Sequence, residues 1–292
     1  MTPQCPNCKQ VSGQDNSRRT VRPRGSFRRK SDSRVVIRFR CLMCKQSFSY
    51  ATLGPCYRQH KRGKNEMVRR LLASGVSQRR IAKVLNLNRK TVVRKFHFLA
   101  QQAELKLAAY QRSKPLVQVL EFDDLETFEH TKCKPLSVTM AVEYKTRRIL
   151  DFEVSAMPCK GKLARISVKK YGYRKDERAA GRTRLFERLR FLVAPGALIK
   201  SDQSPHYPSD VAKYFPDSTH QTHKGRRGCV VGQGELKKIG FDPLFSLNHT
   251  YAKLRDDISR LVRKTWSTTK KKECLAKHLM IHALYHNLSL KN

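Results

Sequence analysis

Three stretches in the middle of the chain decide its fold: LVQVLEFDD (116–124), PLSVTMAVEY (135–144) and RRILDFEVSAM (147–157). The first alternates apolar and polar residues with the period of a β-strand and ends in acidic residues. The other two follow as further strands, joined by a turn at Lys145–Thr146. The sequence therefore predicts three consecutive strands, the first of which places carboxylates at its C-terminal end.

Helices and short strands alternate after these three strands. A long basic segment (160–190) has helical spacing around its leucines, and ALIKSDQSPHY (197–207) predicts a strand that ends in Asp202. SDVAKYF (209–215) predicts a helix, STHQTHK (218–224) a short strand, and NHTYAKLRDDISRLVRK (248–264) a helix. The order β-β-β-α-β-α-β-α is that of an RNase H-like domain.

Acidic residues follow the first and fourth predicted strands. Because neighbouring strands of a sheet place their ends side by side, we expect Asp123 and Asp202 to share Mg²⁺, a hard ion that prefers oxygen ligands. Two such ions about 3.5–4 Å apart are able to activate a water or a 3′-hydroxyl and stabilise a leaving oxygen. Glu121 and Asp124 are the alternatives to Asp123, and strand alternation predicts that Asp124 points away from the face shared by Glu121 and Asp123.

The charge of the chain indicates a polyanionic partner. Of 292 residues, 62 are Lys or Arg and 23 are Asp or Glu, which gives a net charge of +39. Such self-repulsion disfavours a compact protein unless a polyanion screens it, and it argues against an enzyme for small neutral molecules. No apolar run approaches the roughly 18–20 residues that span a bilayer, and no secretory signal is evident. We therefore expect a nucleic-acid-binding protein without a membrane partner.

The basic residues are concentrated in the first third of the chain. Residues 1–100 contain 25 Lys and Arg against three acidic residues, so the acidic residues available for chemistry lie mostly in the remainder. This distribution predicts an N-terminal part that holds phosphates and a C-terminal part that acts on them.

Four of the nine cysteines form two knuckles, CPNC (5–8) and CLMC (41–44). Four thiolates in two CxxC pairs suit tetrahedral Zn²⁺, and strand-like segments at 27–29 and 35–40 between them predict a zinc ribbon. The zinc ligands are then Cys5, Cys8, Cys41 and Cys44. Metal-free buried thiols and a redox CxxC are the alternatives. An odd cysteine count without a signal peptide indicates a reducing compartment such as a cytoplasm.

Residues 65–100 predict three short helices arranged as a helix-turn-helix. Gly75 is placed to end the first helix, Ser77 to cap the second and Asn88 to cap the third. The helix that begins near Asn88 is expected to enter the major groove of DNA. The predicted contacts are Gln78, Arg79, Arg89, Lys90, Thr91, Arg94 and Lys95. A plain three-helix bundle with a solvated basic face is the alternative.

These motifs, in this order, resemble the transposases of small bacterial insertion sequences. CPNC and RCLMCKQSF (40–48) match the ribbon, and SQRRIAKVLNLNRKTV (77–92) matches the helix-turn-helix. EFDD (121–124) resembles the first-aspartate strand and SDQSPHY (201–207) the second. LR (254–255) and RLVRKTWSTTKK (260–271) resemble the basic stretch after the third catalytic residue.

The resemblance implies Mg²⁺-dependent cleavage and strand transfer at the ends of an element. It implies a multimeric complex on double-stranded DNA, which includes the terminal inverted repeats and the target. The family has a Glu early in its last helix, seven residues before an Arg or Lys, and counting back from Arg255 gives Asn248. Asn replaces Glu in some relatives, and the alternative third ligand is Glu235 in GQGELKK (232–238).

The sequence thus predicts an α+β multidomain protein. Its expected parts are a zinc ribbon (1–56), a helix-turn-helix (57–100), a linker (101–115) and an α/β RNase H-like catalytic domain (116–292), with a DNA-gripping basic insertion at about 160–192. The leading function is a DNA transposase, with Asp123, Asp202 and Asn248 as its catalytic residues. The alternatives are a DNA-binding regulator with a decayed catalytic domain, which Asn248 motivates, and a zinc-ribbon nuclease without strand transfer.

Overall fold

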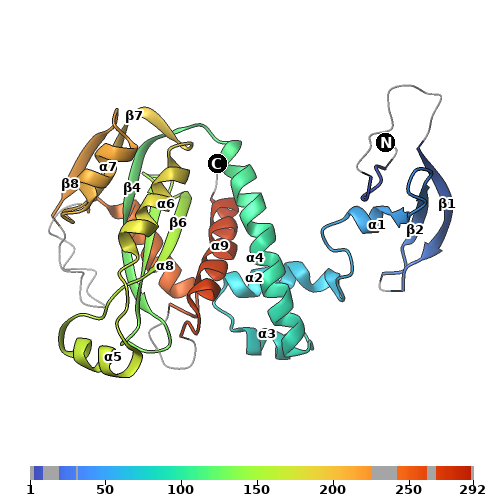
Figure 1. Cartoon of the computed structure of the whole chain (residues 1–292), viewed down its shortest axis with the longest axis horizontal. Helices are drawn as coiled ribbons and strands as arrows, with labels where there is room; N and C mark the ends of the chain where they lie inside the picture. Colours follow the sequence, from blue (N-terminus) through green and yellow to red (C-terminus); the bar gives the residue numbers. More distant parts are fainter. Residues whose placement is uncertain (1–2, 9–19, 31, 225–241, 262–267, 291–292) are drawn as a thin grey trace. The chain divides into compact units, whose positions relative to one another are not determined.

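The computed structural model describes residues 3–8, 20–30, 32–224, 242–261 and 268–290 (Figure 1). The chain divides into two compact units, an N-terminal unit (1–65) and a C-terminal unit (66–292), each with its own core. None of the helices within the described ranges is long and apolar enough to cross a membrane.

The N-terminal unit is built on a small antiparallel sheet. Its strands β1 (Val21–Arg28), β2 (Val35–Cys41) and β3 (Ser47–Ser49) lie in that order, followed by α1 (Tyr50–Leu53) and η1 (Arg62–Lys64). Three apolar side chains and two buried cysteines form its core: Val21, Phe39, Phe48, Cys5 and Cys41. So small a core supplies little hydrophobic stabilisation, which is typical of domains that depend on a metal.

Three helices open the C-terminal unit: α2 (Asn65–Ala73), α3 (Gln78–Val84) and α4 (Arg89–Arg112). Gly75, two residues after the end of α2, has a φ of +75°, a conformation that glycine adopts without steric cost. Ser77 Oγ accepts the backbone N–H of Arg80, and Asn88 Oδ1 accepts that of Lys90 at 2.8 Å. The expected turn glycine and both expected caps are therefore present at the ends of these helices.

The third of these helices continues well beyond the segment expected to contact DNA. α4 spans 24 residues, so the predicted boundary at residue 100 and the predicted linker 101–115 fall largely inside one helix. No Gly or Pro interrupts it between Arg89 and Arg112. It packs against the last helix, α9 (Lys272–Ser289), and its buried stripe includes Val92, Phe96, Leu99, Ala103 and Leu107.

A five-stranded mixed sheet forms the centre of the C-terminal unit. Its strands are β4 (Val117–Phe128), β5 (Pro135–Glu143), β6 (Ile149–Ala156), β7 (Val193–Asp202) and β8 (Thr219–His223). They lie in the order β6-β5-β4-β7-β8, in which β4 to β6 are antiparallel and β7 and β8 run parallel to β4. This arrangement is consistent with the RNase H-like domain that the sequence predicts.

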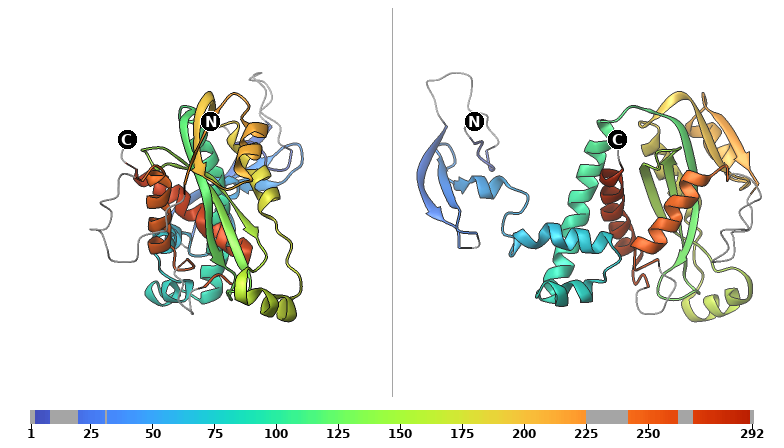
Figure 2. Two further views of the ribbon diagram at one scale, coloured as in Figure 1. Left: turned by 90° about the vertical axis from the view of Figure 1, so that its left-hand side faces the viewer. Right: turned by 180° about the vertical axis from the view of Figure 1, so that it is seen from behind.

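Helices cover both faces of this sheet and create two cores (Figures 1 and 2). On one face, α6 (Arg178–Leu189) and α7 (Tyr207–Tyr214) pack on Leu120 and Phe122 of β4. On the other, α8 (Phe245–Asp257), α9 and α4 pack on Leu125 of β4 and on β5 and β6. Alternate residues of β4 therefore face different helices, as a strand buried on both sides requires.

The expected basic insertion at 160–192 is only partly a surface segment. It begins with η2 (Gly161–Leu163) and α5 (Ala164–Tyr171), whose lysines are exposed. Its second half is α6, a core helix, because Leu185, Phe186 and Leu189 are fully buried. A Cβ at Gly181 would clash with the Ser155 hydroxyl, which shows how closely α6 approaches β6. The interpretation of the whole segment as an insertion is therefore wrong for α6.

The outer edge of β6 is capped rather than open to another strand. Gln111 Nε2 donates to the Leu150 carbonyl at 2.9 Å, Arg188 donates to the Phe152 carbonyl at 3.1 Å, and the N–H of Glu177 donates to the Ala156 carbonyl at 2.9 Å. Edge carbonyls that are already bonded offer no template for pairing with a further chain.

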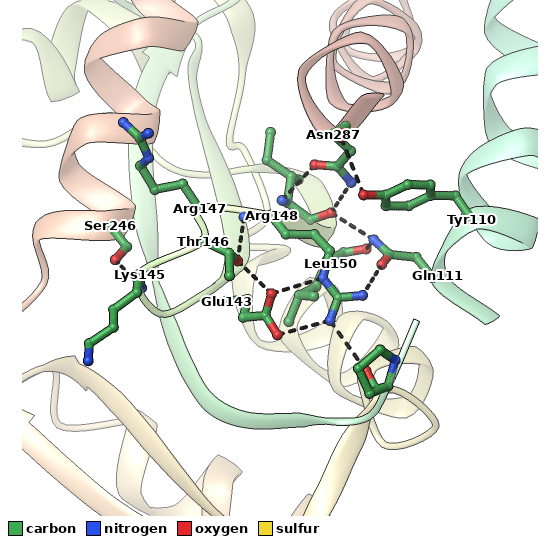
Figure 3. A network of polar contacts seen from close by, with 12 residues as sticks. Tyr110, Gln111, Glu143, Lys145, Thr146, Arg147, Arg148, Leu150, Ser246 and Asn287 are labelled. Carbon is green, nitrogen blue, oxygen red and sulfur yellow. Dashed lines mark hydrogen bonds and ion pairs between the residues drawn. The ribbon is translucent and has the colours of Figure 1, made fainter. Parts of the chain in front are cut away.

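A buried polar network joins α4, the β5–β6 turn and α9 (Figure 3). The Arg148 guanidinium donates to both carboxylate oxygens of Glu143 at 3.1 Å and to Gln111 Oε1 at 3.0 Å. Asn287 of α9 bonds both the N–H and the carbonyl of Ile149. The helix that carries the expected DNA contacts is therefore fixed at its far end to the central sheet.

Candidate functional site

The two predicted aspartates lie on adjacent parallel strands. Glu121 of β4 is paired with Lys200 of β7, so two residues further along Asp123 lies beside Asp202, the last residue of β7. Asp123 itself is not at a strand end, because β4 continues to Phe128 in its antiparallel pairing with β5. The site therefore forms where the parallel partner stops, which differs from the expected meeting of two strand ends.

The two carboxylates influence each other electrostatically. Burial is the largest cause that raises the pKa of Asp123, to about 7, and the negative charge of Asp202 is the second. Asp202 Oδ1 accepts the backbone N–H of Ser204 at 2.9 Å, which fixes this carboxylate at the start of the following loop. A partly buried pair of like charges is the arrangement that a divalent cation neutralises.

Two tyrosines that the sequence did not single out contact Asp123. The Tyr207 hydroxyl of α7 donates to Asp123 Oδ1 at 3.2 Å, and the Tyr251 hydroxyl of α8 donates to the Asp123 carbonyl. Tyr207 lies within the SDQSPHY stretch, five residues after Asp202. Nothing in the sequence signals that its ring reaches back to β4.

The two alternatives to Asp123 have other partners. Asp124 accepts the Thr139 hydroxyl from β5, on the face that carries α6 and α7, as strand alternation predicted. Glu121 faces α8, is fully buried, and accepts the N–H of Leu247 at 2.8 Å. Burial raises the pKa of Glu121 to about 7. The Leu247 contact joins Glu121 to the first turn of α8.

Asn248 lies in the first turns of α8, three residues before Tyr251. The helix begins at Phe245, so Asn248 is inside it rather than at its start as expected. Its side chain is exposed, and its Nδ2 donates to Asp242 Oδ2 at 2.8 Å. Contacts of α8 with Glu121 and Asp123 hold Asn248 on a helix that runs along β4.

Asp242 is an acidic residue that the sequence analysis missed. Its Oδ1 accepts the N–H of Leu244 at 3.0 Å, directly before α8, and its charge raises the pKa of Glu121 after the larger effect of burial. An Asp just before a helical apolar pattern is the signal that would have found it. Glu235, the alternative third ligand, lies outside the described residues.

The donor set at the two aspartates fits Mg²⁺. Within the described ranges, no other carboxylate, histidine or cysteine joins Asp123 and Asp202 in a group whose ligand atoms all lie within 4.8 Å of one another. Mg²⁺ is commonly held by one or two carboxylates while water and substrate phosphate complete its octahedral shell. Two aspartates therefore suit an ion that also binds a phosphodiester, whereas the Asn248 amide bonds Asp242 rather than either aspartate.

The four cysteines of the N-terminal unit form a compact group. Their sulfur atoms all lie within 4.8 Å of one another, with Cys5 and Cys44 at 3.6 Å and Cys8 and Cys41 at 3.9 Å. The pKa of Cys44 is lowered to about 6, and the largest cause is the backbone N–H of Gln46. The pKa of Cys8 is raised to about 12, and the largest cause is its hydrogen bond with Cys44. Four sulfurs at this separation suit a tetrahedral zinc ion.

The side chains expected to contact DNA lie in the first turns of two helices, α3 and α4. Arg79, Arg89, Lys90 and Arg94 are exposed, and Gln78 and Thr91 are partly exposed. No acidic side chain lies between Gln78 and Arg94, so nothing in that stretch neutralises the arginines. The geometry provides an exposed basic surface of the kind that contacts phosphates.

Lys95 is the expected DNA contact that does not belong to this exposed surface. It is 1% exposed, because it follows the buried Val92 by three residues and precedes the buried Leu99 by four, on the packed stripe of α4. The prediction that Lys95 faces DNA is therefore wrong.

No protein-family model and no curated protein sequence matches the chain. Among solved structures, the catalytic domain of Mos1 mariner transposase is similar over 67% of this chain and 93% of that chain, with 14% identity and a TM-score of 0.27. The Mos1 strand transfer complex covers 78% of each chain, with 10% identity and a TM-score of 0.24. Because both scores are below 0.5, the site rests on the contacts described above.

Proposed function

We propose that the chain is a DNA transposase that cleaves and joins DNA strands at the ends of an insertion sequence. The observation that carries this proposal is the juxtaposition of Asp123 and Asp202 at the end of β7, where burial and mutual repulsion raise the pKa of Asp123 to about 7. Two carboxylates forced together in partly buried surroundings destabilise a protein unless they bind a cation or share a proton.

Magnesium is the cation we assign to this pair. When bound, Mg²⁺ supplies an activated water or 3′-hydroxyl and stabilises the leaving oxygen of the phosphodiester. Asp123 and Asp202 supply its negative ligands. Asn248 is the third catalytic residue, and its neutral amide oxygen contributes no charge, so the two aspartates carry the electrostatic part of metal binding.

Double-stranded DNA is the substrate, and the start of α4 is its docking surface. The exposed arginines and lysine at positions 79, 89, 90 and 94 hold phosphates and base edges of the terminal inverted repeats. Target DNA and a second copy of the chain complete the synaptic complex. Zinc on Cys5, Cys8, Cys41 and Cys44 has a structural role in the N-terminal unit.

The test uses full-length protein and DNA that carries the inverted repeats found on either side of the gene. We expect Mg²⁺-dependent strand cleavage at the repeat ends, abolished by Asp123→Asn and by Asp202→Asn while DNA binding persists. Asn248→Ala is expected to reduce cleavage sharply, and Asn248→Glu to retain it. Cleavage that survives both aspartate substitutions would contradict the assignment.

A DNA-binding regulator descended from such an enzyme is the second candidate. It is favoured by the exposed, neutral Asn248, whose amide bonds Asp242, in the place of an acidic third ligand. Specific binding to the repeats, with no cleavage at any Mg²⁺ or Mn²⁺ concentration, would support the regulator.

A further inference from the structure

Tyr207, the first residue of α7, is a buried tyrosine whose hydroxyl ends at the candidate active site. Its side chain is 2% exposed, and its hydroxyl donates to Asp123 Oδ1 at 3.2 Å. A phenol buried in apolar surroundings needs a hydrogen-bond partner, because an unpaired hydroxyl there raises the free energy of the fold. The partner here is the carboxylate that we assign to metal binding.

The ring of Tyr207 is held on several sides. The Phe122 ring lies 4.8 Å away between centroids, and the Arg182 guanidinium lies 5.5 Å from the Tyr207 centroid. Arg182 is itself fixed, because its Nε donates to Asp210 Oδ2 at 2.6 Å from the next turn of α7. With its ring enclosed in this way, the tyrosine has little freedom to move its hydroxyl away from Asp123.

The hydrogen bonds of the Asp123 carboxylate converge on one oxygen. Oδ1 accepts the Tyr207 hydroxyl and also the backbone N–H of Asp124 at 2.7 Å. Among the bonds made by the described residues, none ends on Oδ2. A carboxylate with two donors on one oxygen cannot rotate without losing both, so Oδ2 remains the oxygen available to a ligand.

We propose that Tyr207 is a positioning residue that holds Asp123 by Oδ1 and thereby presents Oδ2 to the catalytic metal. The inference rests on the proposed function, because it assumes that Asp123 binds a divalent cation. It adds a role that neither strand alternation nor the spacing of the acids predicts, since Tyr207 lies on the helix α7 and not on a strand.

The test replaces Tyr207 with phenylalanine, which keeps the ring and removes only the hydroxyl. Mn²⁺ affinity is measured without DNA by electron paramagnetic resonance, and we expect it to fall about tenfold. The Mg²⁺ concentration that gives half-maximal cleavage should rise by a similar factor, whereas saturating Mg²⁺ should restore the rate. The control is Tyr214→Phe at the other end of α7, whose ring contacts Phe186 and not Asp123.

The outcomes separate this inference from the proposed function. Normal Mn²⁺ affinity in Tyr207→Phe, with Asp123→Asn unable to bind Mn²⁺, overturns the role of Tyr207 alone. Mn²⁺ binding that survives Asp123→Asn overturns the metal site itself. Saturating Mg²⁺ that fails to restore cleavage in Tyr207→Phe also overturns the inference, because the residue then acts through the general stability of the fold. Thermal melting of each variant measures that stability.

Discussion

The Glu121 carboxylate accepts a 2.8 Å hydrogen bond from the backbone N–H of Leu247 in the first turn of α8. Two residues further along β4, the Asp123 carbonyl accepts the Tyr251 hydroxyl, one turn further along α8. Two residues of a strand advance by about 6.6 Å and four residues of a helix by about 6 Å, so the two contacts match in spacing. This match holds α8, and with it Asn248, alongside the strand that carries Asp123.

Glu121 makes the metal-free protein less stable as the pH rises. Burial raises its pKa to about 7 in the folded state, whereas in the unfolded chain a Glu ionises near 4.3. Between these values the folded state binds a proton that the unfolded chain releases, so the free energy of unfolding falls as the pH increases from 5 to 8. Asp123, whose pKa is also raised to about 7, contributes in the same direction, so we expect Glu121→Gln to reduce this dependence without abolishing it and to raise the melting temperature at pH 8.

The control for this prediction is Glu126→Gln, at an exposed position on the same strand. It should leave the difference between the melting temperatures at pH 5 and pH 8 as in the wild type. An equal pH dependence in the wild type and in Glu121→Gln would show that the Glu121 carboxyl is not the group responsible.

Local signals in the sequence predicted much of the C-terminal unit. The caps at Ser77 and Asn88 and the glycine at 75 depend only on neighbouring residues, and they lie where expected. The succession of the five strands of the central sheet along the chain also lies where expected. Longer-range features did not: the extension of β4 past Asp123 depends on its pairing with β5, which strand periodicity does not reveal.

The candidate site was predictable to the extent that it lies on strands. Asp123 and Asp202 follow from the ends of predicted strands, but their hydrogen-bond partners Tyr207 and Tyr251 come from helices whose docking is a tertiary property. The prediction for Lys95 was wrong because it followed from the charge of the side chain alone. The helical period places Lys95 on the buried stripe of α4.

Adjacent residues Arg94 and Lys95 should differ in their effect on DNA binding. Arg94 is exposed, whereas Lys95 is 1% exposed on the packed side of α4. We expect Arg94→Ala to weaken binding and to reduce the slope of log affinity against log salt by about 1, because one phosphate contact is lost. Lys95→Met keeps most of the buried volume and should leave that slope unchanged. Filter binding between 50 and 200 mM salt measures this slope for both variants. A reduced slope for Lys95→Met would contradict the placement of Lys95 on the side of α4 that does not contact DNA.

Zinc removal should unfold the N-terminal unit and spare the C-terminal unit. The core of the N-terminal unit consists of three apolar side chains beside the cysteines, whereas the cores of the C-terminal unit do not involve the cysteine group. We expect about one zinc per chain, lost on replacing Cys41 and Cys44 together with Ser. Hydrogen exchange should then show loss of protection in β1 and β2 and full protection in α9. Persistent protection of β1 and β2 in a zinc-free protein would show that the metal is not needed for folding.

The Arg148 network should contribute more to stability than a surface ion pair of the same chemistry. Arg148 is 5% exposed, and its guanidinium binds Glu143 through both carboxylate oxygens and also Gln111 (Figure 3). Arg148→Met leaves the Glu143 carboxylate and the Gln111 amide oxygen without this donor, so we expect a loss of about 3 kcal/mol. The control is Arg184→Met, which breaks the pair with Glu153 on β6; because the Arg184 side chain is 48% exposed, its loss should stay below about 1 kcal/mol. Urea denaturation of both variants measures the difference in the free energy of unfolding. Equal losses in the two single variants would show that the network adds nothing beyond an exposed ion pair.

The double variant Glu143→Gln with Arg148→Met should recover part of the loss of Arg148→Met, because no unpaired carboxylate remains.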